Sequence, residues 1–202
     1  MSIQSVARLF SLLLLVSLPF GKQAMAQGLG KSDVAINVFG QFTSTVSGNG
    51  ITDTPSRSMG PLFTFRQSYK PWLGYEVNYS YTRFSETYTG QIFRVQNNVH
   101  EATGAFLVQG PKFFGLQVFG AAGTGLLVFL PTTVGGQHNT QQYRYPFLYE
   151  VGVNHPLLVN RLGVRVQYRG LIYKAPDYGL PQYRTGATRQ TPEVTVGLFL
   201  RF

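Results

Sequence analysis

The chain has 202 residues, enough for one domain or at most two, and it contains no cysteine. The lack of cysteine excludes a disulfide framework, a thiolate metal site and a cysteine nucleophile. Charged residues make up only 12% of the chain and aromatic residues 14%, so the composition argues against a disordered protein. The net charge of +9 is dispersed, with no Lys/Arg run, which argues against a nucleic-acid partner.

The first 26 residues are predicted to be a secretory signal peptide that is removed. Arg8 supplies the positive start, an apolar run follows at 9–20, and Ala24 and Ala26 form the small-x-small cleavage pattern. A retained membrane anchor is the alternative, but the apolar run is short for a spanning helix. We therefore expect an exported domain over residues 27–202.

Eight later segments of roughly ten residues alternate apolar and polar side chains, which is the period of a β-strand. In the last of them, Val194, Val196 and Leu198 share one face while Thr195 and Gly197 share the other. Three segments alternate less clearly. The expected strands, in chain order, are 34–43, 61–69 (weaker), 73–82, 99–109 (weaker), 116–129 (weaker), 147–154, 163–173 and 193–202.

The predicted connections alternate strictly between short and long. This alternation is typical of an eight-stranded antiparallel transmembrane β-barrel, an all-β fold with short periplasmic turns and long extracellular loops. A soluble β-sandwich has no reason to keep it, and its buried faces would hold fewer large tyrosines. The short turns are expected at 70–72, 110–114 and 156–161, and the long polar loops at 44–58, 83–98, 130–142 and 174–190.

The final strand also carries a recognisable pattern. Thr195, Gly197, Leu200 and Phe202 are similar to the C-terminal signal of outer-membrane barrels, in which a polar residue and a glycine precede two apolar positions. With its strand count and loop alternation, the chain resembles the small eight-stranded barrels typified by the OmpA transmembrane domain and OmpX. This resemblance implies a place in the outer membrane of a Gram-negative bacterium and recognition by the barrel-assembly machinery.

Aromatic residues near the strand ends are predicted to form girdles at the two membrane boundaries, because amphipathic rings favour the headgroup level. The alternative is that tyrosine is simply a good strand residue. The residues assigned to the girdles are Tyr69, Trp72, Tyr75, Tyr81, Tyr143, Tyr145 and Tyr173.

Charged side chains within the strands are predicted to face the lumen, since a lipid-facing Arg or Lys at mid-bilayer costs about 2–4 kcal/mol. An eight-stranded barrel is just wide enough for side chains to fill it, so these charges must pair. They form either a structural plug or a set of pairs that exchange partners and open a gate. The expected lumen charges are Glu76, Glu101, Glu150, Glu193, Arg66, Arg165, Arg169 and Arg201.

An enzyme is the least favoured hypothesis. Some eight-stranded barrels modify lipid A, as PagL and PagP do, and such chemistry needs a histidine beside a serine nucleophile. The histidines are His100, His138 and His155, and no His-x-Ser pair occurs. Ser80 and Ser85 could approach His100 from the neighbouring strand, but nothing selects them. We assign no catalytic residue, metal site or cofactor.

The leading functional hypothesis is therefore a structural or surface-interaction scaffold whose long loops carry binding. The second is a narrow pore for small solutes. The expected partners are outer-membrane lipid and lipopolysaccharide, whose phosphates complement the basic charge, and an extracellular ligand at the loops.

Overall fold

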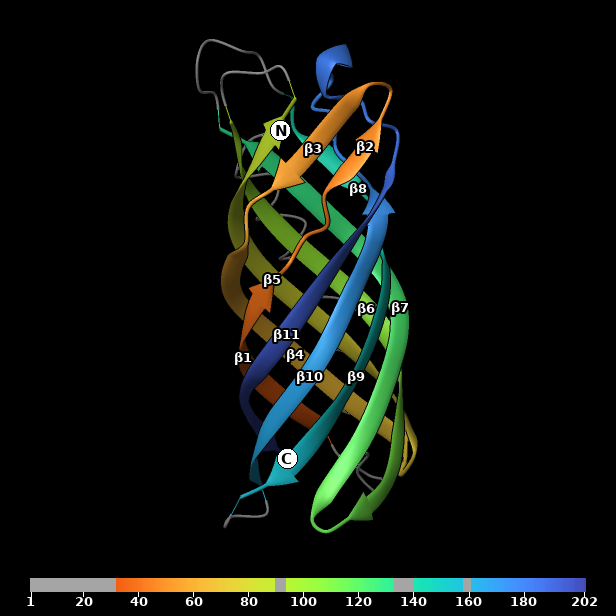
Figure 1. The fold of residues 1–202 in the computed structure, drawn as a ribbon. Helices are drawn as coiled ribbons and strands as arrows, with labels where there is room; N and C mark the ends of the chain where they lie inside the picture. The colour runs from red at the N-terminus through yellow and green to blue at the C-terminus, as the bar shows by residue number, and fades with distance from the viewer. Residues whose placement is uncertain (1–31, 90–93, 133–139, 158–160) are drawn as a thin grey trace, which may run out of the picture. The chain divides into compact units, whose positions relative to one another are not determined.

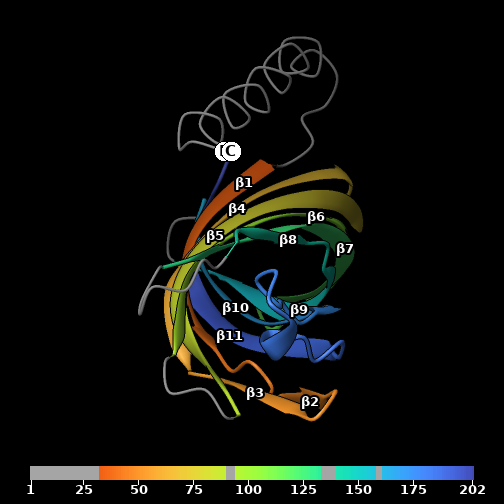
Figure 2. The ribbon, with the colours of Figure 1, turned by 90° about the horizontal axis from the view of Figure 1, so that it is seen from above.

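Eight antiparallel strands close into a barrel in the computed structural model, which describes residues 32–89, 94–132, 140–157 and 161–202 (Figure 1). Each strand pairs with the next, and the first pairs with the last, so the ring has no free edge (Figure 2). The barrel strands are β1 (Ser32–Gln41), β4 (Ser58–Lys70), β5 (Leu73–Tyr88), β6 (Val95–Phe113), β7 (Leu116–Pro131), β9 (Phe147–Pro156), β10 (Leu162–Lys174) and β11 (Thr188–Arg201).

Side chains alternate between the outer wall and the interior, as the period of a strand requires. On β1, the outward Ile36 is 65% exposed and Val38 57%, while the inward Asn37 is 1% exposed and Gln41 4%. The barrel is thus apolar outside and polar inside, the reverse of a water-soluble protein. The fold class predicted from the sequence is confirmed. No helix among the described residues is long and apolar enough to cross a membrane.

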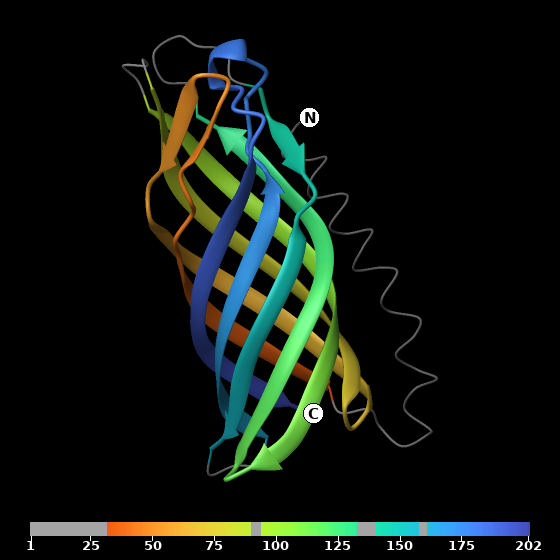
Figure 3. The ribbon, with the colours of Figure 1, turned by 45° about the vertical axis from the view of Figure 1, so that its right-hand side comes forward.

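The two ends of the barrel differ. At one end, called the turn end here, β4 meets β5 across Pro71 and Trp72, and β6 meets β7 across Phe114 and Gly115. The other, the loop end, holds the hairpin of β2 (Val46–Gly48) and β3 (Ile51–Pro55), the short β8 (Gln142–Arg144), and the 3-10 helix η3 (Pro181–Tyr183) (Figure 3). The predicted segregation of short and long connections therefore holds.

The predicted loops contain more regular structure than expected, and this is a correction. β5 continues to Tyr88 and β6 begins at Val95, so both strands rise well into the stretch assigned to the loop at 83–98. In this upper part the alternation continues but its polarity changes. Arg83 faces outward while Phe84 and Tyr88 are buried inside. Strand pairing thus continues beyond the apolar wall, where the outward face no longer needs to be apolar.

A close approach between β6 and β7 depends on glycine at position 123. A Cβ on Gly123 would lie 2.0 Å from the carbonyl oxygen of Gly104 and 2.5 Å from the Cα of Ala105, both backbone atoms of β6. A Cβ on Gly120, on the outward face of the same strand, would meet only the Glu150 carbonyl oxygen at 3.5 Å. The first contact is impossible without a backbone shift, and the second is ordinary van der Waals contact.

We therefore expect Gly123→Ala to lower the barrel's stability by about 1–3 kcal/mol, the usual effect of overpacking, whereas Gly120→Ala leaves it nearly unchanged. The measurement is the urea midpoint for unfolding of each refolded variant in lipid vesicles. Equal midpoints for the two variants would show that β6 and β7 do not need the glycine contact.

Candidate functional site

The middle of the barrel interior holds an ion-pair network built on two arginines. Arg66 on β4 donates from Nε to Oε2 of Glu76 at 2.7 Å and from Nη2 to Oε1 of Glu150 at 2.6 Å. Its guanidinium carbon also lies 3.9 Å from the centre of the Phe119 ring. All of these side chains are buried, so the charges are compensated within the barrel and not by solvent.

Arg169 on β10 joins three carboxylates from three other strands. It pairs with Glu101 on β6, with Glu193 on β11 at 3.0 Å, and with Glu150 on β9 at 3.4 Å. Glu150 therefore connects the Arg66 and Arg169 clusters into one network that crosses the lumen. With four carboxylates and two guanidinium groups, this layer has more acidic than basic groups.

A further pair lies nearer the turn end. Arg165 donates from Nη2 to Oδ1 of Asp33 at 2.7 Å and from Nε to the Asn154 side-chain oxygen at 2.8 Å. Its guanidinium carbon lies 5.1 Å from the centre of the Phe199 ring. The pair links β1 and β10, which flank β11, so it ties together the strands beside the closing seam of the barrel.

An apolar cluster also packs the interior, both beside the charged layer and above it. Its residues come from β5, β6, β7, β9 and β10 and run from Leu107 and Phe119, on the turn-end side of Glu150, up to the tyrosines of the β10–β11 connection. The lumen is thus packed by side chains at both levels. The members are Phe84, Tyr88, Val95, Val99, Ala105, Leu107, Phe119, Ala121, Leu127, Phe129, Leu148, Leu171, Tyr173, Tyr178 and Tyr183.

A second charged cluster closes the loop end, and the sequence analysis missed it. Arg189 on β11 pairs with Glu86 on β5 and with Asp53 on the β2–β3 hairpin. Glu86 also accepts hydrogen bonds from the Tyr178 hydroxyl and, at 3.0 Å, from the Asn97 amide. The cluster fastens both the hairpin and the β10–β11 connection over the barrel interior.

This cluster was missed because its residues fall in stretches assigned to long loops, where charges were read as solvent-exposed. The signal that could have found it is the inward register of β5 and β11 extended upward. Glu86 lies an even number of positions from Glu76, and Arg189 an even number from Glu193, so each shares the lumen face.

The structure places the predicted lumen charges as follows. Glu76, Glu101, Glu150 and Glu193 are buried inside the barrel, as are Arg66, Arg165 and Arg169. Arg201 is only partly buried, at the turn end of β11, where its guanidinium carbon lies 5.5 Å from the Phe199 ring centre. Asp33, Asp53, Glu86 and Arg189 are inward charges that the sequence prediction did not include.

One of the predicted girdle residues is not at the lipid surface, and this is a correction. Tyr173 is 4% exposed and points into the lumen, where its hydroxyl forms a hydrogen bond of 3.0 Å with that of Thr191. It shares the inward face with Arg165 and Arg169, because all three have odd numbers on one regular strand. Its position near a loop outweighed its register in the prediction.

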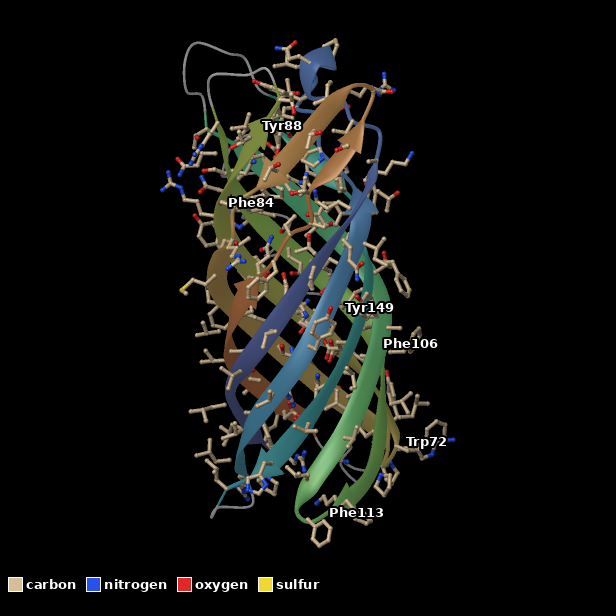
Figure 4. All side chains as sticks on the ribbon, viewed as in Figure 1. Trp72, Phe84, Tyr88, Phe106, Phe113 and Tyr149 are labelled. Atoms are coloured by element: carbon tan, nitrogen blue, oxygen red, sulfur yellow. The ribbon has the colours of Figure 1, made fainter. Side chains whose placement is uncertain are left out.

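The other girdle residues lie on the outside. Tyr69 and Trp72 are exposed at the turn end, where Figure 4 shows Trp72 pointing away from the barrel, and Tyr75 packs against Tyr69 with ring centres 5.4 Å apart. Tyr143 and Tyr145 are exposed at the loop end. Tyr81 is partly exposed and donates to the side-chain oxygen of Asn98 at 3.0 Å.

The residues of the C-terminal pattern divide between the two faces of β11. Thr195 and Gly197 point inward, and Leu200 and Phe202 are exposed on the outer wall. Ala24 and Ala26 of the cleavage pattern lie outside the described residues.

The arrangement around His100 does not match a serine–histidine pair. His100 faces outward and bonds through Nδ1 to the Tyr79 hydroxyl at 2.9 Å, whereas Ser80 faces the lumen and donates to Glu101. Ser85 pairs across the strands with Gln96, four residues from His100. His155 is exposed near the turn end, and His138 lies outside the described residues.

The charge on the surface of the barrel is mainly positive. Of the eight acidic residues in the chain, seven are buried, and the eighth, Asp177, pairs with Arg144 at 3.8 Å. Burial opposes ionisation of Asp177, but hydrogen bonds from Gln142 and Gly179 and the charge of Arg144 lower its pKa overall. The basic side chains left exposed or partly exposed are Arg57, Lys70, Arg83, Arg94, Lys112, Arg144, Arg161, Lys174, Arg184 and Arg201.

A closed antiparallel barrel with an apolar wall and a charged, filled interior defines the class of transmembrane β-barrels. Within that class, the chain has the fold of the small eight-stranded outer-membrane barrels, as solved structures show. No family description matches the sequence, and no curated protein matches it.

Three solved structures illustrate the likeness. The outer membrane protein OprG of Pseudomonas aeruginosa covers 86% of this chain and 96% of its own, with a TM-score of 0.62 and 11% identity. Neisserial surface protein A covers 86% and 99%, with a TM-score of 0.61 and 12% identity. Ail, the attachment invasion locus protein of Yersinia pestis, solved in complex with the heparin analogue sucrose octasulfate, covers 87% and 100%, with a TM-score of 0.56 and 12% identity. At these identities the likeness concerns the fold.

We expect Arg169→Met to destabilise the barrel by about 3–5 kcal/mol, because Glu101, Glu150 and Glu193 would lose their shared guanidinium group inside the lumen. The measurement is the urea unfolding midpoint in vesicles. Arg201→Met is the control, since its side chain is partly exposed.

Changing Glu101 and Glu193 to Gln in the Arg169→Met background should restore part of the loss, because fewer buried charges then lack a partner. No recovery in the triple variant would mean that Arg169 stabilises the barrel by packing and not by charge.

The cluster of Asp53, Glu86 and Arg189, called the loop-end clasp below, should hold the β2–β3 hairpin less firmly as the pH rises. Burial and the nearby Glu86 raise the pKa of Asp53 to about 7, although Arg189 opposes them. The closed hairpin therefore binds a proton that an open hairpin would release, and its stability falls as the pH rises toward 7. Amide hydrogen exchange in β2 and β3, corrected for the intrinsic rate, should be slower at pH 5 than at pH 8. Asp53→Asn should remove this difference, and an unchanged difference would contradict the assignment.

Proposed function

We propose that this protein is an integral protein of the bacterial outer membrane, exported by a signal peptide over residues 1–26, and that it serves as a rigid scaffold with a closed lumen. The observation that carries the proposal is the filled interior. The Arg66–Glu150–Arg169 network crosses the barrel, and the apolar cluster packs the interior beside and above it. Among the described residues, these side chains occupy the interior in which a wide pore has an open channel.

The clasp built on Arg189 supports the same proposal. By holding Asp53 and Glu86 together, it orders the β2–β3 hairpin and the β10–β11 connection at the loop end. Ordered segments on a rigid barrel make a surface suited to binding. The exposed charge at this end is basic, which favours an anionic extracellular partner, and the Ail structure with a heparin analogue is a precedent for this fold.

The remaining sequence predictions fit this proposal. Thr195, Gly197, Leu200 and Phe202 would be read by the barrel-assembly machinery, and the exposed aromatic residues near both ends would sit at the lipid headgroups. Lipid and lipopolysaccharide would surround the apolar wall. An enzyme is not proposed, since the outward His100 bonds to the Tyr79 hydroxyl while Ser80 on the neighbouring strand faces the lumen.

A narrow pore is the second candidate, and one observation favours it. Five buried nitrogen donors have no hydrogen-bond partner among the described residues, and they include Arg66 Nη1, Arg165 Nη1 and Gln167 Nε2 in the spanning part of the interior. Donors of this kind bind water inside proteins. A row of water molecules bound to Arg66 and Arg165 would form the first part of a path for small ions.

Single-channel recording of the refolded protein in a planar bilayer separates the two candidates, after a gel shift on boiling has established a folded barrel. The scaffold predicts no discrete openings for the wild type, for Glu76→Gln or for Glu150→Gln. Reproducible openings whose conductance changes in Glu150→Gln would replace the scaffold by a pore gated through Arg66 and Arg169.

A further inference from the structure

We propose that the outward face of β4, β5 and β6 binds a phosphate-bearing membrane lipid at the loop end, with the lipid phosphates held by Arg57, Arg83 and Arg94. The site rests on the proposed membrane placement but is distinct from the lumen and from the loop-end clasp. Nothing in the scaffold function requires it.

The strand register brings the three arginines onto one patch of the wall. Arg83 is an outward residue of β5. Arg57 directly precedes β4 and is held against β5 by the Ser56 N–H, which donates to the Ser85 carbonyl at 2.7 Å. Arg94 directly precedes β6, next to the pair between Val95 and Glu86. Arg83 lies opposite Asn98, so Arg94 lies four residues, or roughly 13 Å, further toward the loop end along β6. The patch is therefore longer than one phosphate group.

The positive charge of this patch is not compensated. Within the described part of the chain, none of the three arginines forms an ion pair. Arg83 donates to the Gln96 side-chain oxygen at 2.6 Å, and Arg57 lies 5.8 Å from the Phe42 ring centre. The nearest carboxylate along β5, that of Glu86, points inward and is bound by Arg189. Figure 4 shows side chains with nitrogen atoms projecting outward from the wall at about the level of Phe84.

The wall directly below the patch is apolar. Met59 is 74% exposed on β4, and Phe63 and Val77 lie further toward the turn end on the same two strands, both exposed. A membrane lipid whose headgroup points toward the loop end would place its phosphates at the arginines and its acyl chains against this apolar surface. A free anion would occupy the arginines but leave this apolar surface unused.

Arginine is also the side chain best suited to phosphate. Its planar guanidinium group makes paired hydrogen bonds to phosphate oxygens and is weakly hydrated, so it binds well at the edge of an apolar surface. The described residues of the opposite wall form no such cluster. There Lys174 is the outward base on β10, and the nearby Arg144 is already paired with Asp177.

The test uses wild-type protein refolded into phosphatidylcholine vesicles that contain a small share of lipid A with two phosphates. After extraction into a neutral detergent, native mass spectrometry measures the fraction of barrel that retains lipid A. The test variant carries Arg57→Gln, Arg83→Gln and Arg94→Gln. The control carries Lys70→Gln, Lys112→Gln and Arg161→Gln, the same loss of charge at the turn end.

We expect retention of lipid A to fall about tenfold or more in the loop-end variant, and to stay near the wild-type value in the control. Equal loss in both variants would reduce the effect to net charge and overturn the site. Equal retention of lipid A stripped of its phosphates would overturn the role of the arginines.

Displacement of the lipid by millimolar inorganic phosphate would assign the patch to a free anion instead of a lipid. A wild-type barrel that shows the gel shift on boiling but retains no lipid A would also overturn the site alone. The absence of a gel shift would contradict the membrane placement itself, which keeps failure of the proposed function separate from failure of the lipid site.

Discussion

The whole structure depends on keeping charge away from the apolar outer wall. A charged group facing hydrocarbon is costly, so the charges of the spanning strands turn inward, and once inside they must neutralise one another because little water reaches them. Glu150 shows how the charges are neutralised, since it pairs with both Arg66 and Arg169 and so connects strands on different sides of the ring. The barrel's shape and its internal ion pairs are therefore two results of one constraint.

The same constraint explains why the molecule changes character along its axis. Where the wall is apolar, the interior carries the charged network. Where β5 and β6 rise beyond it, outward positions become polar, as at Arg83, and aromatic side chains fill the interior, as at Phe84 and Tyr88. Seven of the eight acidic residues are buried at these two levels, so the exposed surface carries mainly basic groups. Its positive charge follows from how the interior is neutralised.

The alternation of side chains was enough to predict the barrel, its strand number and the inward direction of residues such as Arg66 and Glu76. It could not predict which charges pair, because Arg66 and Glu150 are 84 residues apart and meet only through the closed ring. The alternation did not predict the clasp of Asp53, Glu86 and Arg189, because the predicted strands end where the outward face stops being apolar, whereas the strands of the structure continue beyond that point. The prediction for Tyr173 was wrong for a related reason. It relied on the closeness of Tyr173 to a loop, although the alternation along the strand places this side chain on the inward face.

The seam between β1 and β11 has a kinetic consequence. Asp33 pairs with Arg201 and Gln41 with Glu193, so the ladder that closes the ring joins the two ends of the described barrel. Every other ladder of the ring joins consecutive barrel strands and can form locally. Closure of the ring joins the first and the last barrel strand in chain order and carries a large loop entropy, which makes it the expected slow step of folding. Until it forms, β1 and β11 each present an unpaired edge, the state in which a barrel is most exposed to aggregation.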